Sequence, residues 1–118
     1  MATNSVTTPK LGLTTERTPT ETIVHGTGRI VSDTTQLLRT TVKALFSESK
    51  IVVLDLTDVN YMDSSGLGTM VGLYVSAKAA NCQFKLINLN QHLKELFSIT
   101  RLGEVMAQGH DPDYLGMP

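Results

Sequence analysis

Two adjacent serines follow an acidic residue and precede two glycines in the segment Asp63-Ser64-Ser65-Gly66-Leu67-Gly68. The segment lies between an apolar run at residues 51–56, which has the pattern of a buried strand, and a run with helical spacing at residues 67–80. A hydroxyl at the start of a helix is exposed and lies beside free backbone N–H groups and the positive end of the helix dipole. That position suits a negative group such as a phosphate. The sequence therefore predicts a serine that phosphorylation can switch.

Helix capping is the simplest alternative explanation of Asp63 and Ser64, because Asp and Ser cap helices in many proteins. One cap needs only one such residue, so the surplus hydroxyl is free for another role. Gly66 and Gly68 also clear space around it, which a cap does not require. These features favour a modification or partner-binding site over a cap alone.

Enzymatic readings of the same residues find little support in the sequence. Ser65 lies in a strand–turn–helix setting, but the G-x-S-x-G pattern of a nucleophilic serine is absent. A catalytic triad also needs a histidine, and none of the three histidines carries a signal beyond that of a surface residue (His25, His92 and His110). We therefore expect no catalytic residues and no enzyme.

Cofactor and metal sites are equally unsupported by the motifs. The Walker pattern is missing, and Gly26-Thr27-Gly28 lacks the third glycine of a dinucleotide fingerprint. No pair of His, Cys or acidic residues has metal-ligand spacing in a convincing context. Asp55 and Asp58 fit strand-end solvation and turn formation. We therefore expect neither a metal nor a cofactor.

Length, net charge and cysteine content limit the classes of protein to which the chain can belong. A chain of 118 residues with 41% apolar residues can bury one core and form one domain. The formal net charge of -1 argues against nucleic acid or an anionic membrane surface as a direct partner. There is no apolar run long enough to insert into a membrane and no signal-peptide pattern at the N-terminus. Cys82 is the only cysteine, which excludes an internal disulfide, and we expect a cytoplasmic protein in which this thiol is buried.

The first half of the chain predicts a short tail, two strands and a helix. Residues 1–10 have the composition of a disordered tail. Leu11 begins a weak candidate for an edge strand, and residues 22–30 form a clearer strand with a bulge or turn at its glycines. Asp33 and Gln36 resemble a capping box that opens a helix, which continues through an apolar stripe and ends near residues 47–50.

The second half alternates strands and helices. After the strand at 51–56 and the helix at 67–80, residues 83–88 predict another strand, and Asn90 is a good N-cap for a short helix. Residues 105–106 are a candidate last strand, and residues 108–118 predict an irregular tail. The domain thus spans residues 11–107. The fold class is α/β, with parallel pairing among the later strands and an antiparallel edge formed by the first ones.

These residues resemble a known family. The run from Val53 to Gly68, with its Asp-Ser-Ser-Gly-Leu-Gly segment, is similar to the signature of STAS domains, and more narrowly to the bacterial anti-sigma factor antagonists. The later stretch Leu93-Lys94-Glu95-Leu96-Phe97, with Leu102 beyond it, is similar to the third-helix pattern of the family. The resemblance covers residues 22–106. It implies a small mixed sheet of four to five strands with helices packed mainly on one side.

The resemblance also implies partner switching without catalysis. In that family the unphosphorylated antagonist binds an anti-sigma factor that is itself a serine kinase, and so frees the sigma factor. The kinase then phosphorylates the antagonist on a serine, and a metal-dependent serine phosphatase restores it. Matched onto this chain, the phosphorylated residue is Ser64, and the partner-binding residues are Asp63, Ser65, Gly66, Leu67, Gly68 and the more distant Asp33.

Two departures from the family pattern leave alternatives open. The family often carries an acidic residue soon after the glycine that ends its second strand, whereas Gly28 is followed by Arg29-Ile30-Val31 and Asp33 stands further along. Many members also end in a longer helix than residues 108–118 can form. A structural STAS subunit of a signalling scaffold or of a lipid-transport ATPase complex, without a phosphorylation cycle, is the main alternative. Nucleotide binding by the domain and a weak homodimer also remain open.

Overall fold

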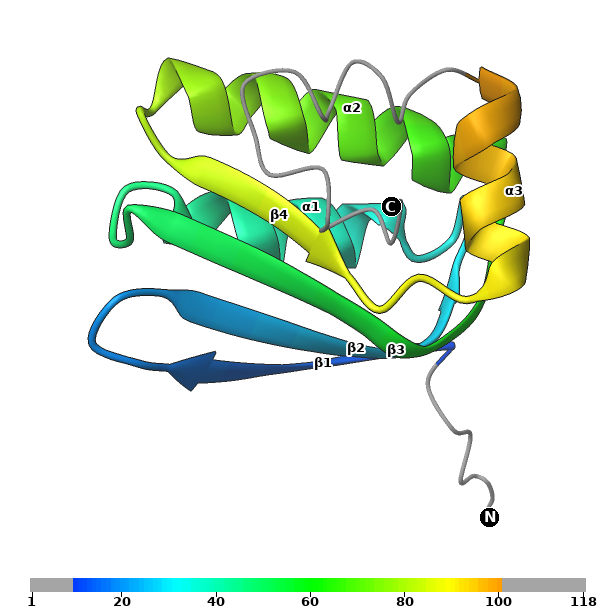
Figure 1. The fold of residues 1–118 in the computed structure, drawn as a ribbon, viewed down its shortest axis with the longest axis horizontal. Helices are drawn as coiled ribbons and strands as arrows, with labels where there is room; N and C mark the ends of the chain where they lie inside the picture. The colour runs from blue at the N-terminus through cyan, green and yellow to red at the C-terminus, as the bar shows by residue number, and fades with distance from the viewer. Residues whose placement is uncertain (1–9, 101–118) are drawn as a thin grey trace, which may run out of the picture.

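The computed structural model describes residues 10–100, which form a four-stranded sheet and three helices (Figure 1). The strands are β1 (Leu11–Arg17), β2 (Thr22–Ile30), β3 (Ile51–Met62) and β4 (Gln83–Ile87), and they lie in the sheet in that order. β1 pairs with β2 antiparallel, whereas β2, β3 and β4 are parallel. The expected mixed sheet with an antiparallel first strand is therefore confirmed.

The helices are α1 (Thr35–Leu45), α2 (Ser64–Ala79) and α3 (Gln91–Thr100). α1 connects β2 to β3 and α2 connects β3 to β4, so each helix is the crossover between neighbouring parallel strands. Both crossovers pack on the same face of the sheet, as the constant hand of such connections requires (Figure 1). α3 lies at the end of the sheet where α2 begins (Figure 1). Asn90 caps α3 as predicted, because its Oδ1 accepts a hydrogen bond from the Leu93 N–H at 2.8 Å.

The core lies between the sheet and the α1–α2 layer. Val24, Leu54 and Leu86 pair side by side across β2, β3 and β4, and all three are fully buried. The next row of the sheet is His25, Asp55 and Ile87, whose side chains point to the other face because direction alternates along a strand. The sheet thus separates an apolar face under the helices from a partly polar open face.

Gly28 allows the antiparallel edge to form. Its φ is +114°, and a Cβ at this position would come within 2.1 Å of the Lys10 carbonyl oxygen. The neighbouring Arg29 N–H donates to that same oxygen at 2.8 Å. The pairing of β2 with β3 shifts register on either side of Thr27 and Gly28, which confirms the bulge expected at these glycines.

β3 is twice as long as the strand predicted at residues 51–56. The polar residues Thr57 and Asp58 suggested that the strand ended there, but both are exposed within β3 while Val59 and Met62 remain buried. Asp58 is paired with Thr27 of β2, so its interpretation as a turn residue was wrong. Asp55 likewise lies in the middle of the strand, not at its end. Tertiary pairing with the nine-residue β2 extends the strand through a locally polar stretch.

The start of α1 also differs from the prediction. Its N-cap is Thr34, and its cap position has no side-chain hydrogen bond to the helix, so the capping box of Asp33 and Gln36 does not form. Instead Asp33 forms an ion pair with Lys10. Thr34 is buried and accepts a hydrogen bond from the Val31 N–H at 2.9 Å, which fixes the loop between β2 and α1. The helix itself carries the expected buried stripe of Leu38, Val42 and Leu45.

Several predictions fall on residues outside the described range. These are the strand at 105–106, the tail at 108–118 and all but the last residue of the tail at 1–10. That last residue, Lys10, is held by its carbonyl bond to Arg29 and by its ion pair with Asp33. The domain limits of 11–107 otherwise stay a prediction.

Candidate functional site

Ser64 is the first residue of α2, and only Asp63 separates it from the end of β3. The helix begins three residues earlier than predicted, because Asp63 is its N-cap and accepts a hydrogen bond from the Gly66 N–H at 3.1 Å. Asp63 therefore supplies the cap, and the hydroxyls of Ser64 and Ser65 are not needed for it. Both serines are exposed. The structure thus gives a solvent-accessible hydroxyl at the N-terminus of a well-capped helix, where the dipole favours added negative charge.

The glycines of the segment differ in what surrounds them. Gly66 is buried, and a Cβ there would lie 2.4 Å from Met62 Cγ. The prediction that Gly66 clears space around the serine was wrong, because its small size is needed for packing α2 on the sheet. A Cβ at Gly68 would meet nothing within 4 Å, so only this glycine leaves open surface beside Ser64.

Leu67, one of the partner-binding residues implied by the family resemblance, does not reach the surface. Its side chain is 5% exposed and belongs to the hydrophobic core. Helical geometry explains the difference, because Leu67 lies on the same face of α2 as the buried Met70 and Tyr74. The surface available to a partner at this helix start is therefore formed by Ser64, Ser65 and Gly68, with Asp63 half-buried beside them.

Asp33 lies at the same end of the sheet as Ser64, beyond the last residues of β2 and β3. β2 and β3 are parallel and end together, with Ile30 paired to Met62. The Asp63 N–H donates to the Ile30 carbonyl at 3.2 Å, which joins the two loops that follow these strands. The hydrogen bond and charge of Lys10 lower the pKa of the exposed Asp33 carboxyl. Asp33 is therefore an ion-paired surface carboxylate at the end of the sheet where Ser64 and Ser65 lie.

Arg39 of α1 reaches the first turns of α2. Its Nη2 donates to Thr69 Oγ1 at 3.3 Å, and the Thr69 hydroxyl donates to the Ser65 carbonyl at 2.9 Å. Thr69 is 3% exposed, so this link is part of the packing between the two helices. Arg39 was not predicted as a site residue; the only sequence signal was its position directly after Leu38 of the apolar stripe of α1. The contact brings a positive side chain beside Ser65.

A second polar cluster lies on the open face of the sheet, where His25 bridges two carboxylates. Its Nδ1 is 2.8 Å from Asp55 Oδ2, and its Nε2 is 2.9 Å from Glu16 Oε1. The hydrogen bonds to Glu16 and Asp55 raise the pKa of His25. Because both ring nitrogens are engaged by carboxylates, the imidazole is not free to take a proton from a serine. The cluster therefore does not form a Ser-His-Asp arrangement.

Asp55 is the most strongly perturbed carboxyl among the described residues. Partial burial acts to raise its pKa, but hydrogen bonds from Thr57, Asn88 and His25 outweigh burial and lower the pKa to about 2. The Thr57 hydroxyl donates to Asp55 Oδ1 at 2.6 Å, and Asn88 Nδ2 donates to the same oxygen at 3.0 Å. This network joins neighbouring strands of the sheet, which gives it a structural role.

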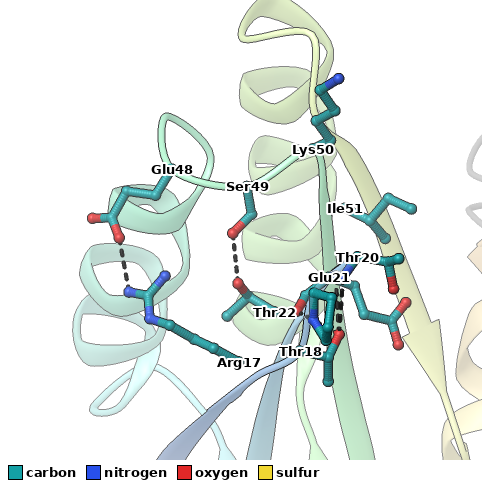
Figure 2. Close-up of a pocket in the computed structure, with 10 residues that line it drawn as sticks. Arg17, Thr18, Thr20, Glu21, Thr22, Glu48, Ser49, Lys50 and Ile51 are labelled. Carbon is teal, nitrogen blue, oxygen red and sulfur yellow. Dashed lines mark hydrogen bonds and ion pairs between the residues drawn. The ribbon is translucent and has the colours of Figure 1, made fainter.

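An open pocket of about 540 Å³ lies beside the first residues of β2 and β3 (Figure 2). Ser64 follows the other end of β3, so the pocket and Ser64 lie at opposite ends of the sheet. The pocket is lined by the β1–β2 turn, the end of the α1–β3 loop and the first residue of β3. Arg17 donates to Glu48 across it at 2.7 Å, and the hydroxyls of Thr22 and Ser49 are 2.5 Å apart (Figure 2). Lys50 points away from these pairs (Figure 2). Four of the polar side chains that line the pocket are thus paired with one another, and the pocket is not continuous with the serine site.

Residues 10–100 contain neither a metal-binding cluster nor a helix that could span a membrane. No group of three or more His, Cys, Asp and Glu side chains in this range could hold a metal ion. Within the same range no helix is long and apolar enough to cross a membrane. Cys82 is buried, and burial raises its thiol pKa, as expected for an inert cysteine.

The fold and the serine segment define a known domain class. Residues 13–112 match the family model described as STAS domain. This match covers most of the chain, and the four-stranded mixed sheet with its helices agrees with it. The chain therefore belongs to the STAS domain family.

The chain is also similar to curated proteins of this class. The chain is similar to an anti-sigma-B factor antagonist of Listeria monocytogenes, with 39% identity over 50% of this chain and 52% of the relative. It is also 35% identical to the anti-sigma-B factor antagonist of Bacillus subtilis, over 70% of this chain and 76% of the relative. The match thus spans about half the length of the Listeria protein and three quarters of the Bacillus protein.

The structural comparison supports the fold. The structure of the anti-sigma factor antagonist SpoIIAA in its unphosphorylated form superposes with a TM-score of 0.68 at 18% identity, covering 79% of this chain and 84% of that chain. At this level of identity the likeness concerns the backbone arrangement alone.

Proposed function

We propose that this chain is an anti-sigma factor antagonist that works by partner switching. In its unphosphorylated state it binds an anti-sigma factor with serine kinase activity, and phosphorylation of Ser64 releases it. A metal-dependent serine phosphatase returns it to the binding state. The chain is a cytoplasmic regulator and has no catalytic role of its own.

The observation that carries this proposal is the exposed Ser64 hydroxyl on a helix start that is already capped by Asp63. A cap made by the serine itself would tie up its oxygen in the protein's own backbone. Because Asp63 makes the cap, Ser64 can be modified without loss of the hydrogen bond that starts the helix. The names of the relatives in Listeria and Bacillus agree with this function.

The position also explains how one phosphate can act as a switch. A phosphoserine adds about -1.5 to -2 charges at neutral pH. The helix N-terminus partly compensates this charge, so α2 is not expected to unfold. Next to the Asp63 carboxylate, however, the charge must be desolvated wherever a partner covers Ser64 and Gly68. Release then follows from electrostatics at the interface, without refolding.

Phosphate transfer with a matched pair of serine variants tests the acceptor. The purified chain is incubated with its cognate anti-sigma factor and ATP, and the added phosphate is mapped by mass spectrometry. We expect one phosphate on the wild type and on Ser65→Ala, and none on Ser64→Ala. Ser65 is the appropriate control because its hydroxyl is also exposed and lies one residue away. Labelling of Ser64→Ala at the wild-type level would refute the assignment.

Binding measurements test the switch itself. Ser64→Glu places a negative group at the helix start, and we expect it to weaken binding of the anti-sigma factor by tenfold or more, on the order of 1.4 kcal/mol. Ser65→Glu is the matched charge control and should weaken binding less. Equal affinity of Ser64→Glu and the wild type would contradict the electrostatic switch. Co-purification with an ATPase and a permease, or with large particles, would instead support the scaffold alternative.

A further inference from the structure

Tyr61 is an exposed aromatic residue close to the proposed phosphorylation site. It lies in the last part of β3, three residues before Ser64, and it is 43% exposed. Among the described residues only Leu37 and Val75 are large apolar side chains with comparable exposure. At this exposure the ring is not part of the hydrophobic core, so its position depends on the side chains around it.

The ring of Tyr61 is held by side chains from two other elements. His92 of α3 stacks on it, with ring centroids 5.2 Å apart and planes inclined by 11°. The Arg29 guanidinium lies over the ring at 6.0 Å from its centroid, and Arg29 is the partner of Tyr61 in the β2–β3 pairing. These three residues, Arg29, Tyr61 and His92, are called the Tyr61 platform below.

One polar atom of the platform has an unfavourable environment in the free chain. His92 Nε2 is buried and has no hydrogen-bond partner among the described residues. Leaving a polar atom unsatisfied costs stability, and folded proteins tolerate this mainly where another function depends on the arrangement. The neighbouring Asn90 fixes the start of α3, because its Nδ2 donates to the Val59 carbonyl at 3.1 Å. Because this bond ties the start of α3 to β3, it also keeps the His92 imidazole beside β3.

We infer that the Tyr61 platform is a second part of the surface that binds the anti-sigma factor. This inference rests on the function proposed above. Tyr61 and Ser64 stand three residues apart at the end of the sheet where β2 and β3 finish. Three residues span at most about 11 Å, which is within the width of a standard protein interface. Aromatic and arginine side chains carry much of the binding energy in protein interfaces. The platform fits a partner surface that offers an apolar group for the ring and a carboxylate for Arg29.

A protein surface fits this geometry better than a nucleotide base does. His92 already stacks on the ring and Arg29 lies over it, so what remains exposed suits side-on packing against another protein. A base would need an open ring face. The platform therefore supplies affinity to the protein complex, and Ser64 supplies the switch.

Equilibrium binding of the cognate anti-sigma factor to the full-length chain tests the inference. We expect Tyr61→Ala to weaken the binding of the unphosphorylated chain at least tenfold. Tyr61→Phe, which keeps the ring, should stay within about twofold of the wild type. Val75→Ala is the control, because Val75 is 59% exposed and stands eleven residues beyond Ser64, about 16 Å along α2. It should also stay within about twofold.

The remaining readouts separate the possible failures. If the urea midpoints of all three variants match that of the wild type, a loss of binding comes from the changed surface. A lower urea midpoint in Tyr61→Ala alone would mean that the ring is needed for folding, and it would overturn the inference. Wild-type affinity of Tyr61→Ala would also overturn it, while leaving the proposed function intact. Absence of binding by the wild type itself would instead refute the proposed function. ATP or GTP binding that Tyr61→Ala abolishes, with partner affinity unchanged, would assign the ring to a nucleotide and overturn the inference.

Discussion

Gly66 packs on Met62 so closely that a Cβ on the glycine would lie 2.4 Å from Met62 Cγ. The same Cβ would be 2.8 Å from the Ile30 carbonyl oxygen, which cannot move without disturbing β2. Gly68 lies two residues further along the same helix and has nothing within 4 Å of its added Cβ. Two glycines of one short motif therefore have different roles: the first lets α2 approach the sheet, and the second leaves the surface beside Ser64 bare.

Alanine at these two positions should change stability in opposite directions. Gly66→Ala forces a methyl group into the Met62 and Ile30 contacts, and overpacking of this kind costs about 1–3 kcal/mol. Gly68→Ala meets no neighbour and gains helix propensity, which is expected to stabilise the chain by about 0.5–1 kcal/mol. Urea unfolding at equilibrium measures both. A stable Gly66→Ala would mean that α2 can shift on the sheet at little cost.

Gly68 also gives a prediction that concerns binding. If a partner covers the start of α2, larger side chains at residue 68 should weaken the complex without weakening the fold. We expect Gly68→Leu to reduce the affinity for the anti-sigma factor by tenfold or more, about 1.4 kcal/mol, while the urea midpoint stays at or above that of the wild type. Gly72→Leu is the matched control, because a Cβ at Gly72 likewise meets nothing within 4 Å and lies one turn further from Ser64. A similar loss in both variants would place the contact along the whole helix.

The His25 cluster predicts a pH dependence of stability. The folded pKa of His25 is raised, so its contribution is complete below the unfolded pKa of about 6.5 and is lost as the pH rises through the higher folded value. The folded pKa of Asp55 is lowered to about 2 from 3.8, so its contribution is present above 3.8 and is lost as the pH falls toward 2. The cluster should therefore stabilise the chain most between about pH 4 and 6.5.

Unfolding free energies of His25→Ala and Asp55→Asn across this range check that prediction. The difference between wild type and His25→Ala should be largest below about pH 6.5 and should shrink as the pH rises through the raised pKa of His25. Because His25 is 40% exposed, the difference is expected to be modest. Asp55 is 15% exposed, and Asp55→Asn should cost about 1–2 kcal/mol at pH 6. A pH-independent deficit in His25→Ala would mean that the ring acts only through packing.

The sequence predicted the order of the elements because each has a strong local signal. The apolar run at 51–56 and the helical stripe of Leu38, Val42 and Leu45 require only local periodicity to be recognised. The cap of α3 by Asn90 was predicted for the same reason. The length of β3 was not, because residues 57–62 depend on pairing with β2, and partner strands are invisible to a local pattern.

The candidate site was predicted in position but not in detail. The exposure of Ser64 followed from its place between a strand and a helix. The burial of Gly66 and Leu67 depends on which face of α2 meets the sheet, and a helix that is apolar on most sides gives no clear stripe to decide this. Tyr61, Arg29 and His92 come together from three elements, so only the fold reveals them. The one available signal was an aromatic residue two positions before the serine motif.

Substitutions at Thr34 test how much its hydroxyl stabilises the loop between β2 and α1. Thr34 is 6% exposed, its hydroxyl accepts from the Val31 N–H at 2.9 Å, and the same oxygen is 2.9 Å from the Arg29 carbonyl to which it donates. Thr34→Val keeps the shape but leaves the Val31 N–H without this partner, and we expect a loss of about 1–3 kcal/mol in urea unfolding. Thr34→Ser keeps the hydroxyl and should lose much less. Equal stability of the two variants would show that the loop does not depend on the hydroxyl.

Asp63 links the fold to the switch most directly, because it caps α2 and stands next to Ser64. Asp63→Ala removes the acceptor of the Gly66 N–H and is expected to destabilise the chain by about 1 kcal/mol. Asp63→Asn keeps an acceptor oxygen without the charge, so most of the stability should return. Asp63→Asn thus separates the capping role of Asp63 from the effect of its charge on binding. If the Asp63 charge adds to the repulsion after phosphorylation, phosphorylated Asp63→Asn should retain more affinity for the anti-sigma factor than the phosphorylated wild type. Equal loss of affinity in both would assign the whole effect to the phosphate and its desolvation.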